Sequence, residues 1–165
     1  MFGHPLYLSF LFAANASAQW LSVDQHNSAS ALAHEMLAAH NQIRARVDVQ
    51  PLIWSASLAA RAQDWADQLL QQGRFYHRPN SNVGENIFEI LGGHVSPAEV
   101  VGDWASEARS YNYRANTCRG LCGHYTQVVW RGTRELGCAV ASKHGREVWV
   151  CDYNPHGNWI GERPY

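Results

Sequence analysis

The sequence predicts an α+β fold in which helices pack on an antiparallel sheet. Three segments with helical spacing of their apolar residues predict helices, and three or four short β-type segments predict strands. Helices and strands do not alternate along the chain as they do in parallel α/β proteins. The length of 165 residues fits one domain, and no repeat or low-complexity linker divides it.

The charge balance argues against two classes of partner. The formal net charge is −1, the Arg residues are scattered along the chain, and Lys143 is the single lysine. Binding to nucleic acid or to an anionic membrane leaves a clustered basic footprint in a sequence. We therefore expect no nucleic-acid partner and no polybasic membrane anchor.

The N-terminal segment predicts a signal peptide over residues 1–18. An apolar run over residues 6–14 is followed by Ala-Ser-Ala at 16–18, which is an A-x-A cleavage signal. Cleavage after Ala18 leaves a secreted protein that begins with a polar leader over residues 19–32. The alternative is a short buried N-terminal helix. No other stretch approaches the ~20 apolar residues of a membrane span, so we expect no stable membrane insertion.

The first half of the domain predicts two helices. The first is expected to begin at a Ser28 or Ser30 cap and to end near Arg46, while residues 19–27 show no clear secondary structure. The second begins at Ser55 or Ser57, ends near Gln72 and is followed by Gly73 as a C-cap. The core-facing residues of the two helices are expected to be Leu32, Met36, His40, Ile43, Leu58, Ala62, Trp65 and Leu69.

The second half predicts strands around a third helix. Residues 86–91 predict a strand, and Ser96 with Glu99 forms a capping box that starts a helix running to about Tyr111. The remaining expected elements are a short extended piece at 52–54, a polar loop at 73–84, a tight loop at 118–123, an element of uncertain type at 125–130, a hairpin at 136–153 and an aromatic coil at 155–165.

The four cysteines predict two disulfides. Export and an even count favour disulfides, and Cys-x3-Cys followed by two isolated cysteines does not match the spacing of a zinc cluster, which is the alternative. If His144-Gly145 is a two-residue hairpin turn, Cys138 lies directly opposite Cys151 in a non-hydrogen-bonded pair, where side chains are close. That turn requires a positive φ at His144, and a longer loop would change the register. Cys118 and Cys122 are then left to close a small loop.

Four polar residues stand out as candidates for chemistry. Glu107 lies on the apolar stripe of the third helix, where it must find a partner or sit at the mouth of a cavity. The alternative is a slightly rotated stripe with Glu107 as a solvated edge residue. His77 and Glu85 lie in polar loops, where each alone would be a surface residue. His124 follows the cysteine loop, which suits a metal ligand or general base, although a capping role is the alternative. His40, on a core stripe, is expected to be structural.

The sequence contains no recognised nucleophile motif. It lacks G-x-S-x-G, P-loop, H-E-x-x-H and G-x-G-x-x-G patterns, and the disulfides occupy all four cysteines. No catalytic residue can be named on this basis, and enzymatic activity stays an open question.

Several segments together resemble the CAP superfamily, which comprises cysteine-rich secretory proteins, antigen 5 and pathogenesis-related type 1 proteins. The two long signatures correspond to His124–Thr133 and Val148–Trp159, and the shorter ones to His40-Asn41-x-x-Arg44 and Gly84–Ile87. Pro51-Leu52-x-Trp54 and Asn158–Tyr165 are similar to the plant pathogenesis-related members. The resemblance covers residues 33–165 as a single domain.

The resemblance implies a three-layer α-β-α sandwich with a small antiparallel sheet, and it implies the same two disulfide pairs. It also implies a divalent metal, with zinc favoured by the mixed imidazole and carboxylate ligands, and no organic cofactor. The implied ligands are His77, Glu85, Glu107 and His124. Three departures from the family pattern are a missing third disulfide at Ser142-Lys143, Asp152 in place of Asn, and Asp48 in place of Gly.

Three functions are compatible with these residues. The favoured one is a secreted, monomeric binding protein for sterols or other lipids, since no nucleophile is evident and the loops are rich in aromatic residues. The alternative is a metal-dependent hydrolase, similar to a peptidase, that uses the His/Glu cluster. In a third hypothesis the metal is purely structural.

Overall fold

The computed structural model describes the backbone of residues 13–165 and the side chains from residue 28 onward. The chain falls into two compact units, residues 1–31 and 32–165. All strands of the described residues lie in the second unit. No helix among the described residues is long and apolar enough to cross a membrane.

A four-stranded sheet forms the centre of the second unit, with strand order β1-β5-β6-β2. β2 (Gly84–Leu91), β5 (Glu135–Lys143) and β6 (Arg146–Asn154) are antiparallel, as predicted. The short edge strand β1 (Ile53–Trp54) instead runs parallel to β5. The predicted antiparallel sheet therefore has one short parallel pairing, at this edge. About 80 residues separate β1 from β5, so no hairpin imposes opposite directions on them.

The β5–β6 hairpin has the predicted register. Lys143 pairs with Arg146 and Cys138 with Cys151, around a two-residue turn in which His144 has φ 51° and Gly145 φ 75°. Two positive φ angles match the right-handed twist of the flanking strands. Disulfides join Cys138 to Cys151 and Cys118 to Cys122. Both predicted pairs are confirmed.

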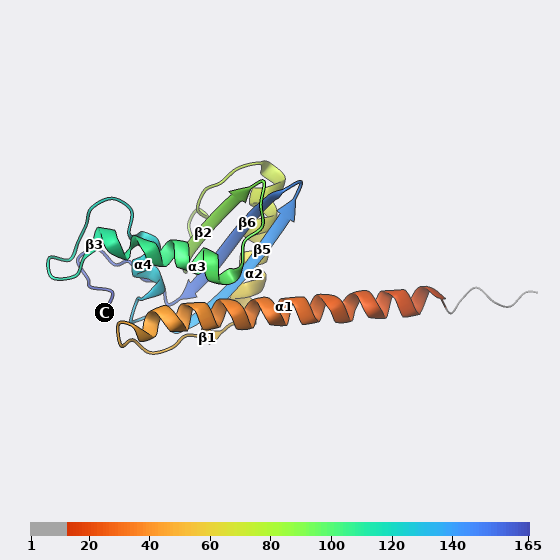
Figure 1. Ribbon diagram of the computed structural model, residues 1–165, viewed down its shortest axis with the longest axis horizontal. Helices are drawn as coiled ribbons and strands as arrows, with labels where there is room; N and C mark the ends of the chain where they lie inside the picture. Colours follow the sequence, from red (N-terminus) through yellow and green to blue (C-terminus); the bar gives the residue numbers. More distant parts are fainter. Residues whose placement is uncertain (1–12) are drawn as a thin grey trace, which may run out of the picture. The chain divides into compact units, whose positions relative to one another are not determined.

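Helices cover both faces of the sheet (Figure 1), which confirms the α-β-α sandwich. On one face α2 (Ala56–Gln72) buries the predicted stripe Leu58, Ala62, Trp65 and Leu69 and ends at Gly73 in a left-handed cap. On the other face, α1 (Ala13–Ala45), α3 (Pro97–Ser106) and α4 (Gly123–Val128) contribute to a second core. The buried residues of this core include Met36, Trp104, Leu136, Trp149 and Tyr153.

The first helix begins earlier than predicted. α1 starts at Ala13 rather than at Ser28 or Ser30, so it runs through the predicted leader. The segment contains no Gly or Pro, and an internal serine costs a helix only about 0.5 kcal/mol, so nothing forces a start at either serine. The cleavage site predicted after Ala18 lies inside this helix, and residues 1–12 of the predicted signal peptide lie outside the described residues.

The third helix ends earlier than predicted. The Ser96–Glu99 capping box is present, but α3 stops at Ser106 and tightens into a 3₁₀ turn, η1 (Glu107–Ser110). The chain then enters β3 (Tyr111–Asn112), which pairs with β4 (Thr117–Cys118). This pairing pulls Tyr111 off the helical path, and it leaves Glu107 at the junction between helix and turn.

The helix-ending turn after α1 carries the strain expected of a non-glycine residue. Asp48 has φ 55°, in the left-handed region where a side chain is disfavoured and glycine is not. A left-handed residue is thus required at the position where the resemblance predicts glycine.

Candidate functional site: two histidine–glutamate pairs

His77 and Glu85 form the first pair. His77 lies in the loop after α2, and Glu85 is the second residue of β2. Nδ1 of His77 donates to Oε1 of Glu85 at 2.7 Å, and the same oxygen accepts the Arg78 backbone N–H at 3.0 Å. The glutamate side chain is 5% exposed, whereas the imidazole is mostly exposed. The hydrogen bond to Glu85 raises the pKa of His77 above its ordinary value.

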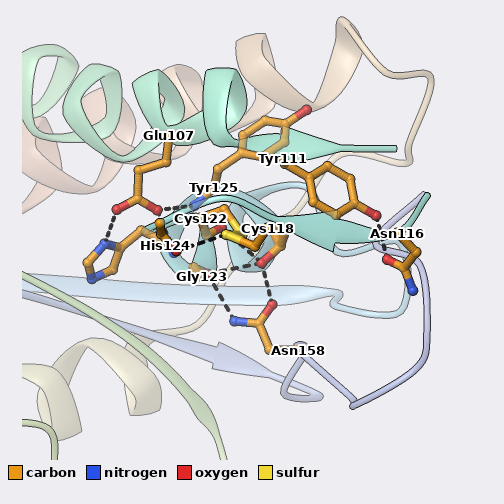
Figure 2. Close-up of a disulfide and its surroundings, with 11 residues drawn as sticks. Glu107, Tyr111, Asn116, Cys118, Cys122, Gly123, His124, Tyr125 and Asn158 are labelled. Carbon is orange, nitrogen blue, oxygen red and sulfur yellow. Dashed lines mark hydrogen bonds and ion pairs between the residues drawn. A yellow bond between two sulfur atoms is a disulfide. The ribbon is translucent and has the colours of Figure 1, made fainter. Parts of the chain in front are cut away.

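His124 and Glu107 form the second pair (Figure 2). Nδ1 of His124 donates to Oε1 of Glu107 at 2.8 Å, and Oε2 accepts the backbone N–H groups of His124 and Tyr125 at 2.9 and 3.3 Å. Glu107 thus satisfies the free N–H groups at the start of α4, where a negative charge is favourable. Of the two alternatives raised by its sequence position, the partnered one is correct.

The disulfide loop fixes the backbone that presents His124. Cys122 precedes α4 and is bonded to Cys118. Asn158, from the C-terminal coil, donates to the Gly123 carbonyl at 2.9 Å and accepts from the Thr126 hydroxyl at 2.7 Å. Figure 2 shows these contacts around the disulfide. The backbone at His124 is therefore fixed by the disulfide loop that precedes it and by Asn158 of the C-terminal coil.

The two pairs lie next to each other. The ring centroids of His77 and His124 are 6.4 Å apart, and His124 also stacks on Trp104, which is part of the core. In the part of the chain with described side chains, no hydrogen bond involves Nε2 of either histidine. The predicted ligands His77, Glu85, Glu107 and His124 therefore come together as two oriented imidazoles, each held by its own carboxylate.

The four residues do not form a closed ligand set. Within the described side chains, no three of their ligand atoms lie within 4.8 Å of one another, and the group that meets this criterion is His40, Cys138 and Cys151. Both sulfur atoms of that group are in a disulfide. His40 donates from Nδ1 to the Met36 carbonyl, its Nε2 lies 2.9 Å from the Tyr153 hydroxyl, and burial lowers its pKa to about 4. His40 is structural, as predicted.

Behind Glu85 lies a buried charged network that sequence reasoning missed. Nε of Arg61 donates to Oδ2 of Asp152 at 2.9 Å, and Asp152 is paired with Glu85 across β2 and β6. Among the described side chains, the buried polar atoms without a hydrogen bond are Nε1 of Trp65, Nε of Arg78, Oε2 of Glu85 and Oδ1 of Asp152. Burial raises the pKa of Asp152 to about 6, against the opposing effect of Arg61.

Asn86 is a second residue that sequence reasoning missed. Its buried side-chain amide donates to the His124 carbonyl and to the Tyr153 hydroxyl, both at 3.1 Å. It thereby connects β2, α4 and β6 beneath the two pairs. Its place directly after Glu85 in Gly84-Glu85-Asn86-Ile87 is the signal that could have identified it.

Comparison with known proteins identifies the family. A model of the cysteine-rich secretory protein family, CAP, matches residues 37–153.

The chain belongs to the CAP family.

Its relatives include plant pathogenesis-related proteins. Pathogenesis-related protein 1 of Arabidopsis thaliana is 44% identical over 132 residues, which cover 79% of this chain and 81% of that protein. Pathogenesis-related leaf protein 4 of Solanum lycopersicum is 45% identical over 134 residues, covering 79% and 82%. Pathogenesis-related protein PR-1 of Medicago truncatula is 37% identical over 169 residues, covering 99% and 97%.

Solved structures share the fold of this CAP domain. Venom allergen-like protein 4 of Schistosoma mansoni superimposes with a TM-score of 0.67 at 23% identity, covering 79% of this chain and 90% of that one. The crystal structure of NaASP2 with Zn²⁺ gives 0.64 at 24% identity, covering 81% and 84%. At these identities the likeness concerns the fold.

The CAP domain also has two adjoining grooves between α1 and α3. One, of about 300 Å³, is lined by Ala39, Gln42, Ile43, Arg46, Ala98, Val101, Gly102, Ala105 and Ser106. The other, of about 330 Å³, is lined by His34, Glu35, Ala38, Ala39, Gln42 and Ala98. The three shared residues, Ala39, Gln42 and Ala98, make them one continuous surface that combines small and apolar side chains with polar ones.

Proposed function

We propose that this protein is a secreted binding protein that takes a sterol, fatty acid or other lipid in the α1–α3 groove and holds a divalent metal, zinc first, between His77 and His124. The observation that carries the proposal is the pair of imidazoles that are each fixed through Nδ1 and free at Nε2. A secreted location is supported by membership of the cysteine-rich secretory protein family and by the two disulfides.

The two histidines are chemically suited to a metal. A ligating histidine usually donates its other ring nitrogen to a carboxylate, which fixes the tautomer and the orientation of the ring. Glu85 and Glu107 do this for His77 and His124. Zn–N bonds are about 2.0 Å long, so rings 6.4 Å apart need little movement to share one ion. The glutamates then orient ligands rather than bind, although the unpartnered Oε2 of Glu85 stays available.

The fold neighbour NaASP2 was crystallised with Zn²⁺, which supports zinc as the first ion to test. Calorimetric titration of zinc into the metal-free protein should show one site, and His124→Asn and His77→Asn should each weaken it about tenfold or more. His94→Asn is the matched control, because His94 also pairs with a glutamate, Glu147, outside the site. Unchanged zinc affinity in both site variants would contradict the metal proposal.

The groove is suited to a narrow apolar ligand. The alanines that line it, Ala39 on α1 and Ala98 and Ala105 on α3, have small side chains and leave space between the two helices. The buried side chains of Ile43 and Val101 form its apolar base. Apolar walls with a small number of polar groups are typical of small-molecule sites. Arg46 at one end can pair with a carboxylate headgroup, and Gln42 can donate to a sterol hydroxyl.

The groove can be tested by filling it. Ala98→Phe places a ring in the space shared by both grooves, so retention of fatty acids and sterols from a lipid panel should be lost. Ala60→Phe, at an exposed position on α2, is the control and should retain them. If the unmodified protein retains no lipid above an unrelated secreted protein, the lipid part of the proposal is wrong.

A metal-dependent hydrolase is the second candidate, and one observation favours it. With both glutamates engaged on Nδ1 atoms, two histidine ligands leave coordination positions open for water, as catalytic sites require. Peptidase activity should then disappear in both Glu107→Ala and His124→Ala. Activity that survives both substitutions excludes this use of the site.

If zinc is purely structural, a chelator lowers the melting temperature without changing lipid retention.

A further inference from the structure

Two segments far apart in the sequence form one end of the second unit, which we call the tip: residues 111–122 and 155–165. Asn116 donates to the carbonyls of Gly161 and Glu162 at 3.3 and 3.2 Å. The rings of Tyr113 and Tyr165 stack with centroids 4.8 Å apart. Figure 1 shows the β3–β4 hairpin and the end of the chain together at this end of the unit.

The tip holds an unusual share of exposed apolar side chains. Ile160 is fully exposed, Leu121 is 77% exposed and Trp159 is 53% exposed. Together with the half-exposed Tyr113 they make up four of the eight large hydrophobic residues that are exposed among the described side chains. Clustering of this kind marks an interaction surface, because scattered single residues are the norm on a monomer.

The same tip carries a local positive charge. Its charged side chains are Arg114, Arg119, Arg163 and Glu162, whereas the rest of the chain has more acidic than basic residues. Arg114 and Arg119 have no carboxylate partner among the residues whose side chains are described. Arg114 and Arg119 lie on the hairpin segment, and Arg163 of the C-terminal coil joins them, since its guanidinium donates to the Arg114 carbonyl at 3.0 Å.

The apolar side chains are held outward by a fixed backbone. The Cys118–Cys122 disulfide closes the loop that carries Leu121. Asn158, next to Trp159, bonds to Thr126 and Gly123 of α4, and Nε of Arg163 donates to the Tyr113 carbonyl. Because these loops are already anchored, little conformational entropy is lost when a partner covers Leu121 and Ile160.

We propose that the tip docks on the surface of a membrane that contains anionic phospholipids. Leu121, Trp159 and Ile160 enter the boundary between headgroups and acyl chains, where Trp is favoured, and the arginines contact lipid phosphates while their stems lie along the apolar layer. Arginines around exposed apolar residues match the negative surface of an anionic bilayer, which attracts each nearby Lys or Arg. Docking is peripheral and reversible, and it concerns a bilayer surface rather than a lipid held in the groove.

Vesicle binding tests the docking surface. Protein exported by expressing cells should co-sediment with vesicles of phosphatidylcholine and phosphatidylserine, with a blue shift of tryptophan fluorescence. It should bind vesicles of phosphatidylcholine alone more weakly, and added salt should weaken binding to the anionic vesicles. Ile160→Ser should lower the partition coefficient about tenfold, and Arg119→Gln about fivefold.

Matched controls separate docking from general surface effects. Leu91→Ser removes another largely exposed apolar side chain far from the tip, and Lys143→Gln removes a surface charge. Both variants should bind vesicles like the unmodified protein. Equal vesicle binding by the tip variants and the unmodified protein, or no binding at all, overturns the proposal. The groove variant Ala98→Phe should still dock, so failure of the lipid-retention proposal can be told apart from failure of docking.

Discussion

Asp152 lies at a position where the resemblance to the CAP pattern predicts asparagine, and its surroundings are buried and charged. The carboxylate is fully buried, bonded to Arg61 through Oδ2 and without a partner at Oδ1. Burial raises its pKa to about 6, from an ordinary value of 3.8. The folded state therefore binds the Asp152 proton more tightly than the unfolded chain does. Stability from this group is complete below about pH 4 and is lost as the pH rises through 6.

Asp152→Asn should stabilise the metal-free protein at neutral pH. Asparagine resembles the protonated acid, so it removes the cost of a buried charge and should raise the free energy of unfolding at pH 7 by about 1–3 kcal/mol. Urea unfolding between about pH 4 and pH 7 measures this, and the gain should vanish at the acidic end. A variant that is less stable at pH 7 would mean that attraction to Arg61 outweighs desolvation.

Glu85 controls the titration of His77 through a hydrogen bond to the imidazole. Its hydrogen bond favours the imidazolium, which raises the His77 pKa. Glu85→Gln should therefore lower the His77 pKa toward 6.5, and NMR titration of the ring protons measures it. Glu107→Gln is the matched control, since it touches the other histidine and should leave the His77 titration unchanged.

At the scale of elements, the contact between α2 and β5 depends on one glycine. A Cβ built on Gly137 would lie 2.1 Å from the Ala59 nitrogen and 2.4 Å from the Leu58 carbonyl carbon. Those atoms are backbone at the start of α2, so they cannot rotate away. The absence of a side chain at Gly137 therefore allows α2 to pack closely against β5.

Gly137→Ala should destabilise the protein by about 2–4 kcal/mol, because α2 must shift away from the sheet. Gly102→Ala is the control: its added methyl group meets open space on α3, and it should stabilise by about 0.5–1 kcal/mol through helix propensity. Thermal and denaturant unfolding of the two variants give the comparison. Equal stability of both variants would show that α2 is not held by this contact.

Element boundaries show what local signals specify. Ser96, Glu99 and Gly73 predicted the ends of helices correctly, because caps act through neighbouring backbone groups. The end of α3 could not be predicted in this way. Tyr111 continues the apolar stripe of the helix, but it pairs with Cys118 in a strand, and the spacing along α3 does not encode that partner.

For the whole molecule, Arg44 links segments that are distant in sequence. Its guanidinium is fully buried and donates to the carbonyls of Gln50, Val128, Trp130 and Thr133. Burial lowers its pKa to about 10, so the charge persists at neutral pH. It ties the end of α1 to the end of α4 and the turn that leads into β5.

Arg44→Lys should destabilise the whole unit by about 3–5 kcal/mol, because one ammonium cannot reach four carbonyls and buried acceptors are left unpaired. Arg46→Lys, two residues away and exposed, should change the free energy of unfolding by less than about 0.5 kcal/mol. Denaturant unfolding compares them. A loss confined to Arg44→Lys, with an unchanged m-value, indicates a cooperative unit.

The sequence by itself determined the family, the hairpin register, both disulfides and the helix caps. These depend on local spacing: a two-residue turn at His144-Gly145 places Cys138 opposite Cys151 without reference to any other segment. Glu85 and His124 could also be identified, since each lies within a contiguous signature.

Only the tertiary structure decided which atoms of those residues are available. Glu107 and His124 are 17 residues apart, and no periodicity indicates that their contact is through Nδ1. The Arg61–Asp152 pair and the tip likewise join segments separated by tens of residues. Such contacts depend on how the helices and the sheet pack on one another. The proposal that His77 and His124 are ligands oriented by Glu85 and Glu107 therefore rests on the tertiary structure.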